Sequence, residues 1–124
     1  DLIGRWPTEL WPRNVSFRGV LTERGDLVAR LQTADALLTM SQHEACPNHV
    51  LEAMACGLPV LYLDSGGTRE IVGDAGMSIT EASFEKALPI VMIEGGGMAR
   101  RRALKFAPDV IFPQYLAAIQ AAVR

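Results

Sequence analysis

The chain has 124 residues, of which 49% are hydrophobic and 21% charged, and its formal net charge is -2. This length is that of one globular domain with its own core, and the charge balance excludes a general attraction to nucleic acid. Cys46 and Cys56 lack the spacing of a metal or redox site, and no apolar run is long enough to cross a bilayer. We therefore expect a single cytoplasmic domain over residues 1–124, without a metal and with both thiols reduced.

The first predicted elements are a strand over residues 15–18, which ends at Gly19, and a helix that follows it. Thr22 is a candidate cap for this helix, which we expect to run to about Thr33. Leu27, Val28 and Leu31 are spaced to form one apolar face of the helix. The change of period from two to 3.6 indicates a strand followed by a helix.

Strands and helices then alternate along the middle of the chain. The expected order is strand 36–40, helix 48–56, strand 59–63, short helix 67–72 and strand 75–79. This alternation predicts an α/β fold, a Rossmann-like parallel sheet with helices on both faces. Ligands of such sheets bind beyond the carboxyl ends of the strands, so the loops at residues 41–48 and 64–68 are expected to face one cleft.

The helix predicted at residues 48–56 carries the candidate binding site. Asn48 is the expected N-cap, and Gly57 stands where a helix end favours positive φ. The first turn should leave the backbone N–H groups of His49, Val50 and Leu51 without intrahelical partners, which together with the helix dipole makes a seat for phosphate.

Two carboxylates flank this predicted seat, Glu44 in the loop before the helix and Glu52 one turn inside it. Carboxylates accept hydrogen bonds, so they recognise hydroxyl groups of a ligand rather than its phosphate. The alternative is that both are ordinary surface charges, because two Glu at this spacing also occur by chance.

The C-terminal third is expected to be helical with several interruptions. Thr80 should cap a helix to about residue 93 that Pro89 kinks or breaks, and residues 95–97, all glycine, should separate it from a helix at 98–107. After Pro108 and Pro113 a last helix is expected at residues 115–123. The cluster Arg100, Arg101, Arg102 and Lys105 is interpreted as a solvated helix face, with lipid-headgroup binding and peripheral membrane association as the alternative.

Several segments resemble one known family in the same order along the chain. They are Phe17-Arg-Gly-Val20, Ala34-Asp-Ala36, residues 44–60, residues 64–76 and residues 101–106. Together they resemble the C-terminal, nucleotide-sugar-binding half of retaining glycosyltransferases with the GT-B fold, the glycosyl transferases group 1 family. One departure is that many members carry Gly-Phe-Gly where this chain has Ala45-Cys46-Pro47. Pro47 has no N–H to donate, so phosphate contacts would have to begin at Asn48.

The resemblance implies roles for individual residues. Glu44, the first Glu of the Glu-x7-Glu pair, would contact the transferred sugar near the reaction centre as the catalytic residue, and Glu52 would bind ribose. The other donor-binding residues would be Gly19, Val20, Cys46, Asn48, His49, Val50, Leu51, Gly66 and Gly67. The donor would be a nucleoside diphosphate sugar, with no cofactor and no nucleic-acid partner.

The resemblance also implies a fragment of a two-domain enzyme. The chain opens at Asp1 without an initiator Met, and it would be inactive without the missing N-terminal, acceptor-binding domain. The alternative is a nonenzymatic module that binds a nucleotide or sugar phosphate. A dinucleotide oxidoreductase ranks last, because no Gly-x-Gly-x-x-Gly follows the first strand.

Overall fold

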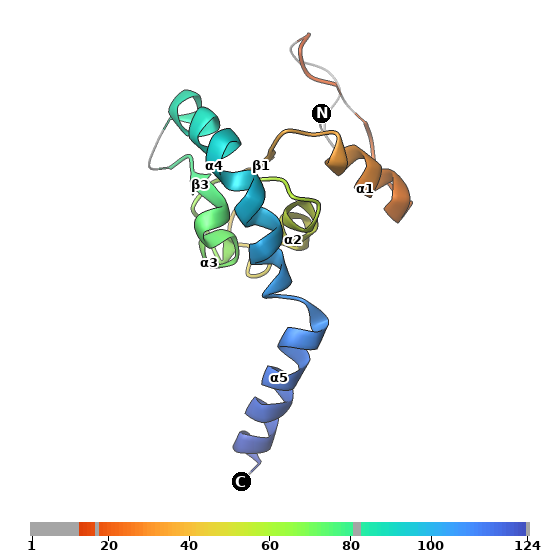
Figure 1. Cartoon of the computed structure of the whole chain (residues 1–124), viewed down its shortest axis with the longest axis vertical. Helices are drawn as coiled ribbons and strands as arrows, with labels where there is room; N and C mark the ends of the chain where they lie inside the picture. The colour runs from red at the N-terminus through yellow and green to blue at the C-terminus, as the bar shows by residue number, and fades with distance from the viewer. Residues whose placement is uncertain (1–12, 17, 81–82, 124) are drawn as a thin grey trace. The chain divides into compact units, whose positions relative to one another are not determined.

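The computed structural model describes residues 13–16, 18–80 and 83–123 (Figure 1). The chain forms two compact units, residues 1–33 and residues 34–124, and each is described by itself. In the first unit, helix α1 spans Arg24–Gln32 and begins after Glu23, so the cap predicted at Thr22 is wrong by one residue. The strand predicted at residues 15–18 is also wrong for residues 15, 16 and 18, which are irregular. A short apolar pattern becomes a strand only where a neighbouring strand pairs with it.

The second unit is built on a parallel sheet of three strands in the order β1-β2-β3. The strands are β1 (Leu37–Thr39), β2 (Val60–Tyr62) and β3 (Gly76–Ser78). Helix α2 (Asn48–Ala55) joins β1 to β2, and α3 (Thr68–Val72) with the 3₁₀ turn η1 (Gly73–Ala75) joins β2 to β3. These five main elements confirm the predicted α/β fold. Because the strands lie side by side in chain order, both crossovers place their helices on one face.

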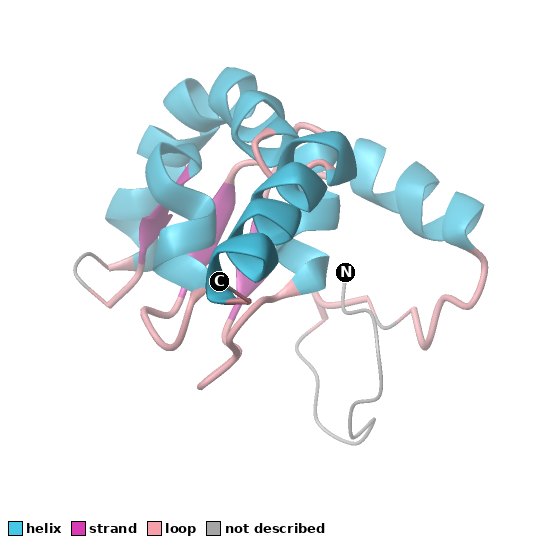
Figure 2. Cartoon of the chain, turned by 90° about the horizontal axis from the view of Figure 1, so that it is seen from below, coloured by secondary structure: helices cyan, strands magenta, loops and turns pink. Residues whose placement is uncertain are grey.

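The core is divided between the two faces of the sheet, and Figure 2 shows helices around the three strands. Val60 and Tyr62 pack on one face with residues of α2, α3 and the end of α4, namely Val50, Met54, Ile71, Val72 and Ala99. Leu61 points to the other face and packs with Ala87 and Val91 from the first half of α4. Helices therefore cover both faces of the sheet, as the sequence predicts. With both faces covered, every residue of the central strand β2 is buried.

Helix α2 ends as its sequence predicts. Gly57 follows the last turn with a φ of 90°, a conformation that glycine adopts without steric cost. Its N–H donates to the Met54 carbonyl at 2.9 Å, and the Leu58 N–H donates to the Ala53 carbonyl at 3.0 Å. This pair of bonds is the Schellman motif, and it turns the chain directly into β2.

Helix α4 (Phe84–Leu104) is continuous, so the predicted cap at Thr80, the break at Pro89 and the interruption at residues 95–97 are wrong, while a kink at Pro89 stays a prediction. It begins after Ser83, while the Thr80 hydroxyl accepts the Asp64 N–H at 3.0 Å instead of capping the helix. Pro89 does not break it, because Pro89 and Glu85 are both exposed and water can bond the Glu85 carbonyl that loses its partner. The glycines at 95–97 lie inside it. Gly95 is buried, and a Cβ there would lie 2.4 Å from Pro59 Cβ, so glycine here allows close packing.

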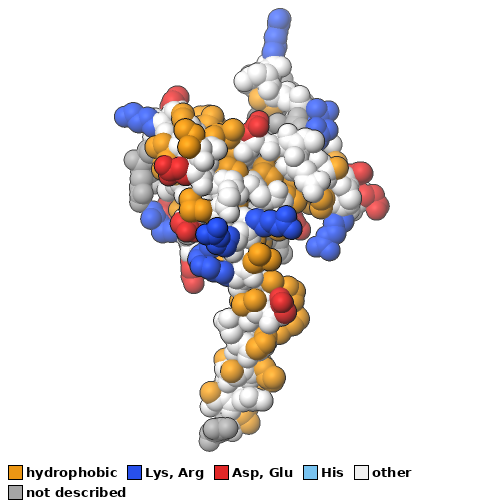
Figure 3. All heavy atoms as spheres, in the orientation of Figure 1, with side chains coloured by type: hydrophobic (Ala, Val, Ile, Leu, Met, Phe, Trp, Pro, Cys, Tyr) orange, Lys and Arg blue, Asp and Glu red, His pale blue; other side chains and the backbone are white. Residues whose placement is uncertain are grey.

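Helix α5 (Pro108–Ala122) also differs from the prediction, because it starts at Pro108 and continues through Pro113. A proline is well tolerated as the first helical residue, since its missing N–H would have had no partner there. No residue of α5 is buried. Figure 3 shows hydrophobic side chains along it, and the large exposed ones are Val110, Phe112, Tyr115, Leu116 and Ile119. Within the described part of the chain, no helix combines the length and apolar character needed to span a membrane.

Candidate functional site

Two loops meet at the carboxyl ends of β1 and β2. The Gly67 N–H donates to the Glu44 carbonyl at 2.9 Å, and the His43 N–H donates to Ser65 Oγ at 3.0 Å. These bonds join the loop between β1 and α2 to the loop between β2 and α3. They confirm the prediction that the two loops lie together, and a cleft shared by them stays a prediction.

The glycines of the second loop make this contact sterically feasible. Gly66 has a φ of 66°, and a Cβ on it would lie 2.4 Å from the Glu44 carbonyl oxygen. A Cβ on Gly67 would lie 2.1 Å from the Ala45 carbonyl oxygen. Real Cβ atoms do not approach so closely, so any side chain at either position would push the loops apart. Both glycines thus touch the backbone of the predicted catalytic loop, and their contact with a ligand stays a prediction.

The amino end of α2 differs in detail from the expected phosphate seat. Pro47, not Asn48, is the N-cap, and no side chain caps the helix. The Pro47 carbonyl already accepts the amides of Val50 and Leu51, at 3.0 and 3.4 Å. The expectation of free N–H groups at these two residues is therefore wrong, because the carbonyl of an N-cap accepts the first bonds of the helix. The amides of Asn48 and His49 have no helical partner, and they are the donors left for an anion.

His49 is anchored by a polar network that the sequence reasoning missed. Its Nε2 lies 2.9 Å from Oγ1 of Thr39, the last residue of β1, and Thr39 is only 6% exposed. Thr39 Oγ1 donates to Ser41 Oγ at 3.3 Å and accepts the Ser41 N–H at 3.4 Å. The signal in the sequence that indicates this network is the change from the apolar Leu37 and Leu38 to the hydroxyl residues Thr39 and Ser41 at the carboxyl end of β1. This network connects the end of β1 to the first turn of α2.

The two acidic residues of the predicted pair differ in exposure. Glu44 is half-buried in the first loop, and Glu52 is exposed on α2. Cys46 is an exposed free thiol in the same loop as Glu44. The described residues contain no group of three or more His, Cys, Asp or Glu side chains arranged to hold a metal ion. The roles of these residues toward a ligand stay predictions.

A second charged pair lies at the carboxyl end of β2. Arg69 of α3 donates from Nε and Nη2 to Asp64 Oδ2, at 2.9 and 2.6 Å. The hydrogen bond from Arg69 is the main cause that lowers the pKa of Asp64; desolvation opposes it, and the Arg69 charge lowers the pKa further. This pair was not among the predicted site residues, and it closes the loop that carries Gly66 and Gly67.

Arg102 departs from the solvated face predicted for the basic cluster. Its Nε donates to the Ile71 carbonyl at 2.9 Å, its Nη2 bonds the Glu70 carbonyl, and its guanidinium carbon lies 5.4 Å from the centre of the Phe106 ring. Arg102 therefore caps the end of α3 from α4. The cluster's other members, Arg100, Arg101 and Lys105, are exposed, and their proposed lipid contact stays a prediction.

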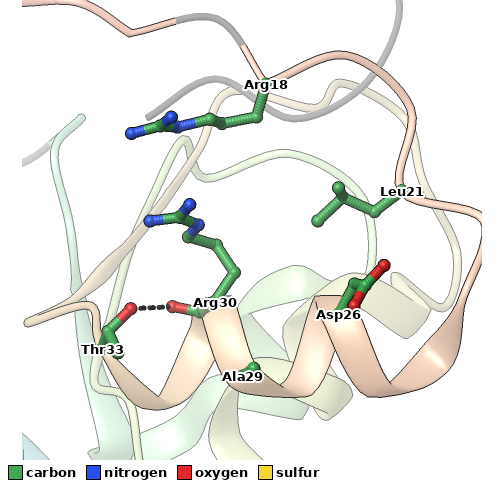
Figure 4. A pocket seen from close by; sticks show the side chains of 6 residues that line it. All are labelled: Arg18, Leu21, Asp26, Ala29, Arg30 and Thr33. Atoms are coloured by element: carbon green, nitrogen blue, oxygen red, sulfur yellow. Dashed lines mark hydrogen bonds between the residues drawn. The ribbon is translucent and has the colours of Figure 1, made fainter.

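A hollow of about 450 Å³ lies in the first unit (Figure 4). Its lining residues are Arg18, Leu21, Asp26, Ala29, Arg30 and Thr33. The guanidinium groups of Arg18 and Arg30 point to the same side of it, away from Leu21 and Asp26. Gly19 and Val20, two of the predicted donor-binding residues, are in the chain between Arg18 and Leu21, and Gly19 has a φ of 70°. The lining residues of this hollow include none of the predicted donor-binding residues.

Comparison with known proteins finds one curated relative and one matching family. A GDP-mannose-dependent alpha-mannosyltransferase of Mycolicibacterium smegmatis is 37% identical over 65 residues, which are 51% of this chain and 17% of that protein. The chain therefore spans only a small part of this relative. The family profile for glycosyl transferases group 1 matches residues 3–93, which include both loops, α2 and α3. The chain belongs to the glycosyl transferases group 1 family.

Proposed function

We propose that this chain is the donor-binding part of a retaining glycosyltransferase, which transfers a sugar from a nucleoside diphosphate sugar to an acceptor. The observation that carries the proposal is the bond from Gly67 N–H to the Glu44 carbonyl at 2.9 Å, which holds the predicted catalytic loop against the second loop. Both loops follow strands of the parallel sheet, so the contact between them lies at its carboxyl edge, where such folds bind their ligands. Family membership supplies the class of reaction.

The diphosphate of the donor would bind at the amino end of α2. The amides of Asn48 and His49 are its donors, and the helix dipole adds a partial positive charge there. In the reaction this site would stabilise the negative charge that develops on the departing nucleoside diphosphate. Glu44 would orient the transferred sugar through its hydroxyl groups, and Glu52 would bind the ribose.

The relative's printed name suggests GDP-mannose as the first donor to test. Backbone NMR during titration of the chain with GDP-mannose, and with UDP and ADP sugars, should show shifts confined to residues 48–52 and to Gly66 and Gly67. Glu52→Gln should weaken binding roughly tenfold, because the hydrogen bond from the ribose hydroxyl then goes to a neutral amide oxygen instead of a charged carboxylate. Glu85→Gln, an exposed carboxylate on the first turn of α4, is the control and should bind as the unaltered chain does. Shifts scattered over other elements would contradict the proposal.

The catalytic part of the proposal needs a chain that also carries an acceptor-binding domain. In that longer protein, Glu44→Gln should reduce turnover by roughly a hundredfold or more, since a group near the reaction centre is altered. The product should keep the anomeric configuration of the donor, as read from the anomeric proton coupling. Turnover that Glu44→Gln leaves unchanged would remove Glu44 from the mechanism, and donor binding without any turnover would favour the nonenzymatic module.

A further inference from the structure

His43, in the loop between β1 and α2, has a left-handed backbone conformation. Its φ is 58°, and the other described residues with positive φ, Gly19, Gly57, Gly66 and Gly73, are all glycine. A Cβ makes this conformation less favourable than it is for glycine. The His43 side chain is exposed, so its packing does not offset the cost. Hydrogen bonds of the surrounding loop are left to maintain the conformation.

Two hydrogen bonds hold the chain on either side of this point. Before it, the His43 N–H donates to Ser65 Oγ at 3.0 Å, and after it the Glu44 carbonyl accepts the Gly67 N–H at 2.9 Å. Both partners belong to the loop between β2 and α3. The direction of each bond is fixed, because a backbone N–H can only donate. His43 and Glu44 are therefore tied at both ends to the second loop, which restricts the backbone angles between the two bonds.

The carboxylate of Glu44 depends on this backbone for its direction. Among the described residues, none makes a hydrogen bond or ion pair with that carboxylate. Rotation about the N–Cα bond of His43 moves the planar peptide group that leads to Glu44, and so changes the direction in which the Glu44 side chain leaves the loop. A functional side chain needs surrounding bonds that hold it in a productive geometry. For Glu44, the bonds of the loop backbone serve this purpose.

We propose that Ser65 is a positioning residue for Glu44, because its hydroxyl holds His43 at positive φ and thereby directs the Glu44 carboxylate toward the transferred sugar. This inference rests on the proposed function, which gives Glu44 its role. Ser65 acts only through the backbone of His43 and touches no substrate. Gly67 holds the same segment from the other side of Glu44. The imidazole of His43 has no part in this arrangement.

The conformational part can be tested on the chain without any ligand. The NOE between the amide proton and the Hα of one residue is strong only at positive φ, so it should be strong for His43. Ser65→Ala removes the acceptor and should weaken this NOE, whereas Ser65→Thr keeps a hydroxyl and should retain it. Ser83→Ala is the matched control, because Ser83 is an exposed serine whose side chain makes no cap bond to α4. A His43 NOE that Ser65→Ala leaves unchanged would overturn the inference.

The functional part is tested in the longer protein that carries an acceptor-binding domain, with GDP-mannose as the donor. Ser65→Ala should lower kcat roughly ten- to a hundredfold, because a displaced catalytic group loses its near-attack geometry. The KM for the donor should stay within about twofold, since the amides of Asn48 and His49 that bind the diphosphate are unaltered. Ser65→Thr should restore most of the kcat, because the acceptor for the His43 amide is present again.

Substitutions at residue 43 separate the backbone from the imidazole. Asn adopts positive φ more readily than most residues that carry a Cβ, and a β-branched residue such as Val adopts it least readily. His43→Val should therefore lower kcat as Ser65→Ala does, while His43→Asn should lower it less. Equal losses in the two variants would refute the inference, because the imidazole and not the backbone would then be what matters.

The remaining contradicting results are distinct from a failure of the proposed function. A kcat that Ser65→Ala leaves unchanged, or a donor KM that rises as much as kcat falls, would overturn the positioning role and leave the donor-binding assignment standing. If the unaltered chain binds none of the GDP, UDP and ADP sugars, the proposed function fails and the role of Ser65 fails with it, whatever the His43 NOE shows.

Discussion

The two junctions between strand and helix in the second unit differ in how they are built. The first, between β1 and α2, is longer and carries the side chains with chemistry, and Thr39 and Ser41 anchor His49 there. The second, between β2 and α3, contacts the first through the backbone of Gly66 and Gly67 and through Ser65 Oγ. The difference teaches that the junction between β1 and α2 supplies the candidate functional groups. The junction between β2 and α3 holds that first junction in place, and at Gly66 and Gly67 it does so without side chains.

The support of the second junction extends through α3 to α4. Arg102 bonds the Ile71 and Glu70 carbonyls at the end of α3, and the Arg69 to Asp64 pair closes the loop at its beginning. Both ends of this five-residue helix are therefore tied by arginine side chains. A helix so short is not stable by itself, so its position depends on such tertiary contacts.

The strongest test of this comparison is Gly67→Ala. The new Cβ would lie 2.1 Å from the Ala45 carbonyl oxygen, so the two loops must separate and the bond to the Glu44 carbonyl would be lost. We expect a loss of roughly 2–4 kcal/mol in the free energy of unfolding, measured by urea denaturation. Gly97→Ala is the control, since nothing lies within 4 Å of a Cβ there. It should stabilise α4 by roughly 0.5–1 kcal/mol, and equal stability of the two variants would contradict the supporting role of the second junction.

A smaller effect is expected from Arg102→Met, which keeps an apolar stem of similar length and removes the guanidinium. The carbonyls of Ile71 and Glu70 would lose their donor, which should cost roughly 1–2 kcal/mol in the free energy of unfolding. Amide hydrogen exchange should also become faster in α3 than in α2. Arg101→Met alters the exposed neighbour and should stay within about 0.5 kcal/mol of the unaltered chain. Unchanged exchange in α3 would show that Arg102 does not hold this helix.

The smallest effect concerns pH. The folded pKa of Asp64 lies below its ordinary value of 3.8, mainly through the hydrogen bond from Arg69. A carboxylate with a lowered folded pKa stabilises the fold above its unfolded pKa, and this stabilisation is lost as pH falls through the folded pKa. Asp64→Asn should therefore be less stable than the unaltered chain at neutral pH, and the difference should shrink on acidification.

The Asp64 titration can be read directly from its carboxyl carbon by NMR. In the unaltered chain the midpoint should lie below 3.8, and Arg69→Met should raise it toward that value. A midpoint of Asp64 that does not respond to Arg69→Met would show that the pair does not close the second loop in solution.

Much of the second unit could be predicted from local pattern. The strands and helices from residue 36 to residue 79 were predicted to within about two residues of their observed ends, because short apolar runs alternate with turn residues there. Gly57 was predicted as a helix end, because a helix that turns sharply needs positive φ. The contact between the two loops was also predictable, since parallel strands end at the same edge of a sheet.

The errors arose where a local signal competes with tertiary packing. The glycines at 95–97 are poor helix formers, yet α4 continues through them because Gly95 packs closely on Pro59 and nothing crowds Gly97. Thr80 has the chemistry of an N-cap, but its hydroxyl accepts the Asp64 N–H from a loop 16 residues earlier. Thr39 and Ser41 were missed because their role depends on His49, which a strand, a loop and a helix start must bring near them.

The sequence by itself determined the alternation of short strands and helices, the glycine that ends α2, the family, and the residues that are candidates for donor binding. These follow from backbone preferences and side-chain chemistry, which are properties of each residue and its close neighbours in the chain. Only the tertiary structure decided that Pro47 occupies the amides of Val50 and Leu51, that Thr39 holds His49, and that Arg102 caps α3. Such contacts depend on the direction and distance between groups on different elements, and packing of the whole unit sets both.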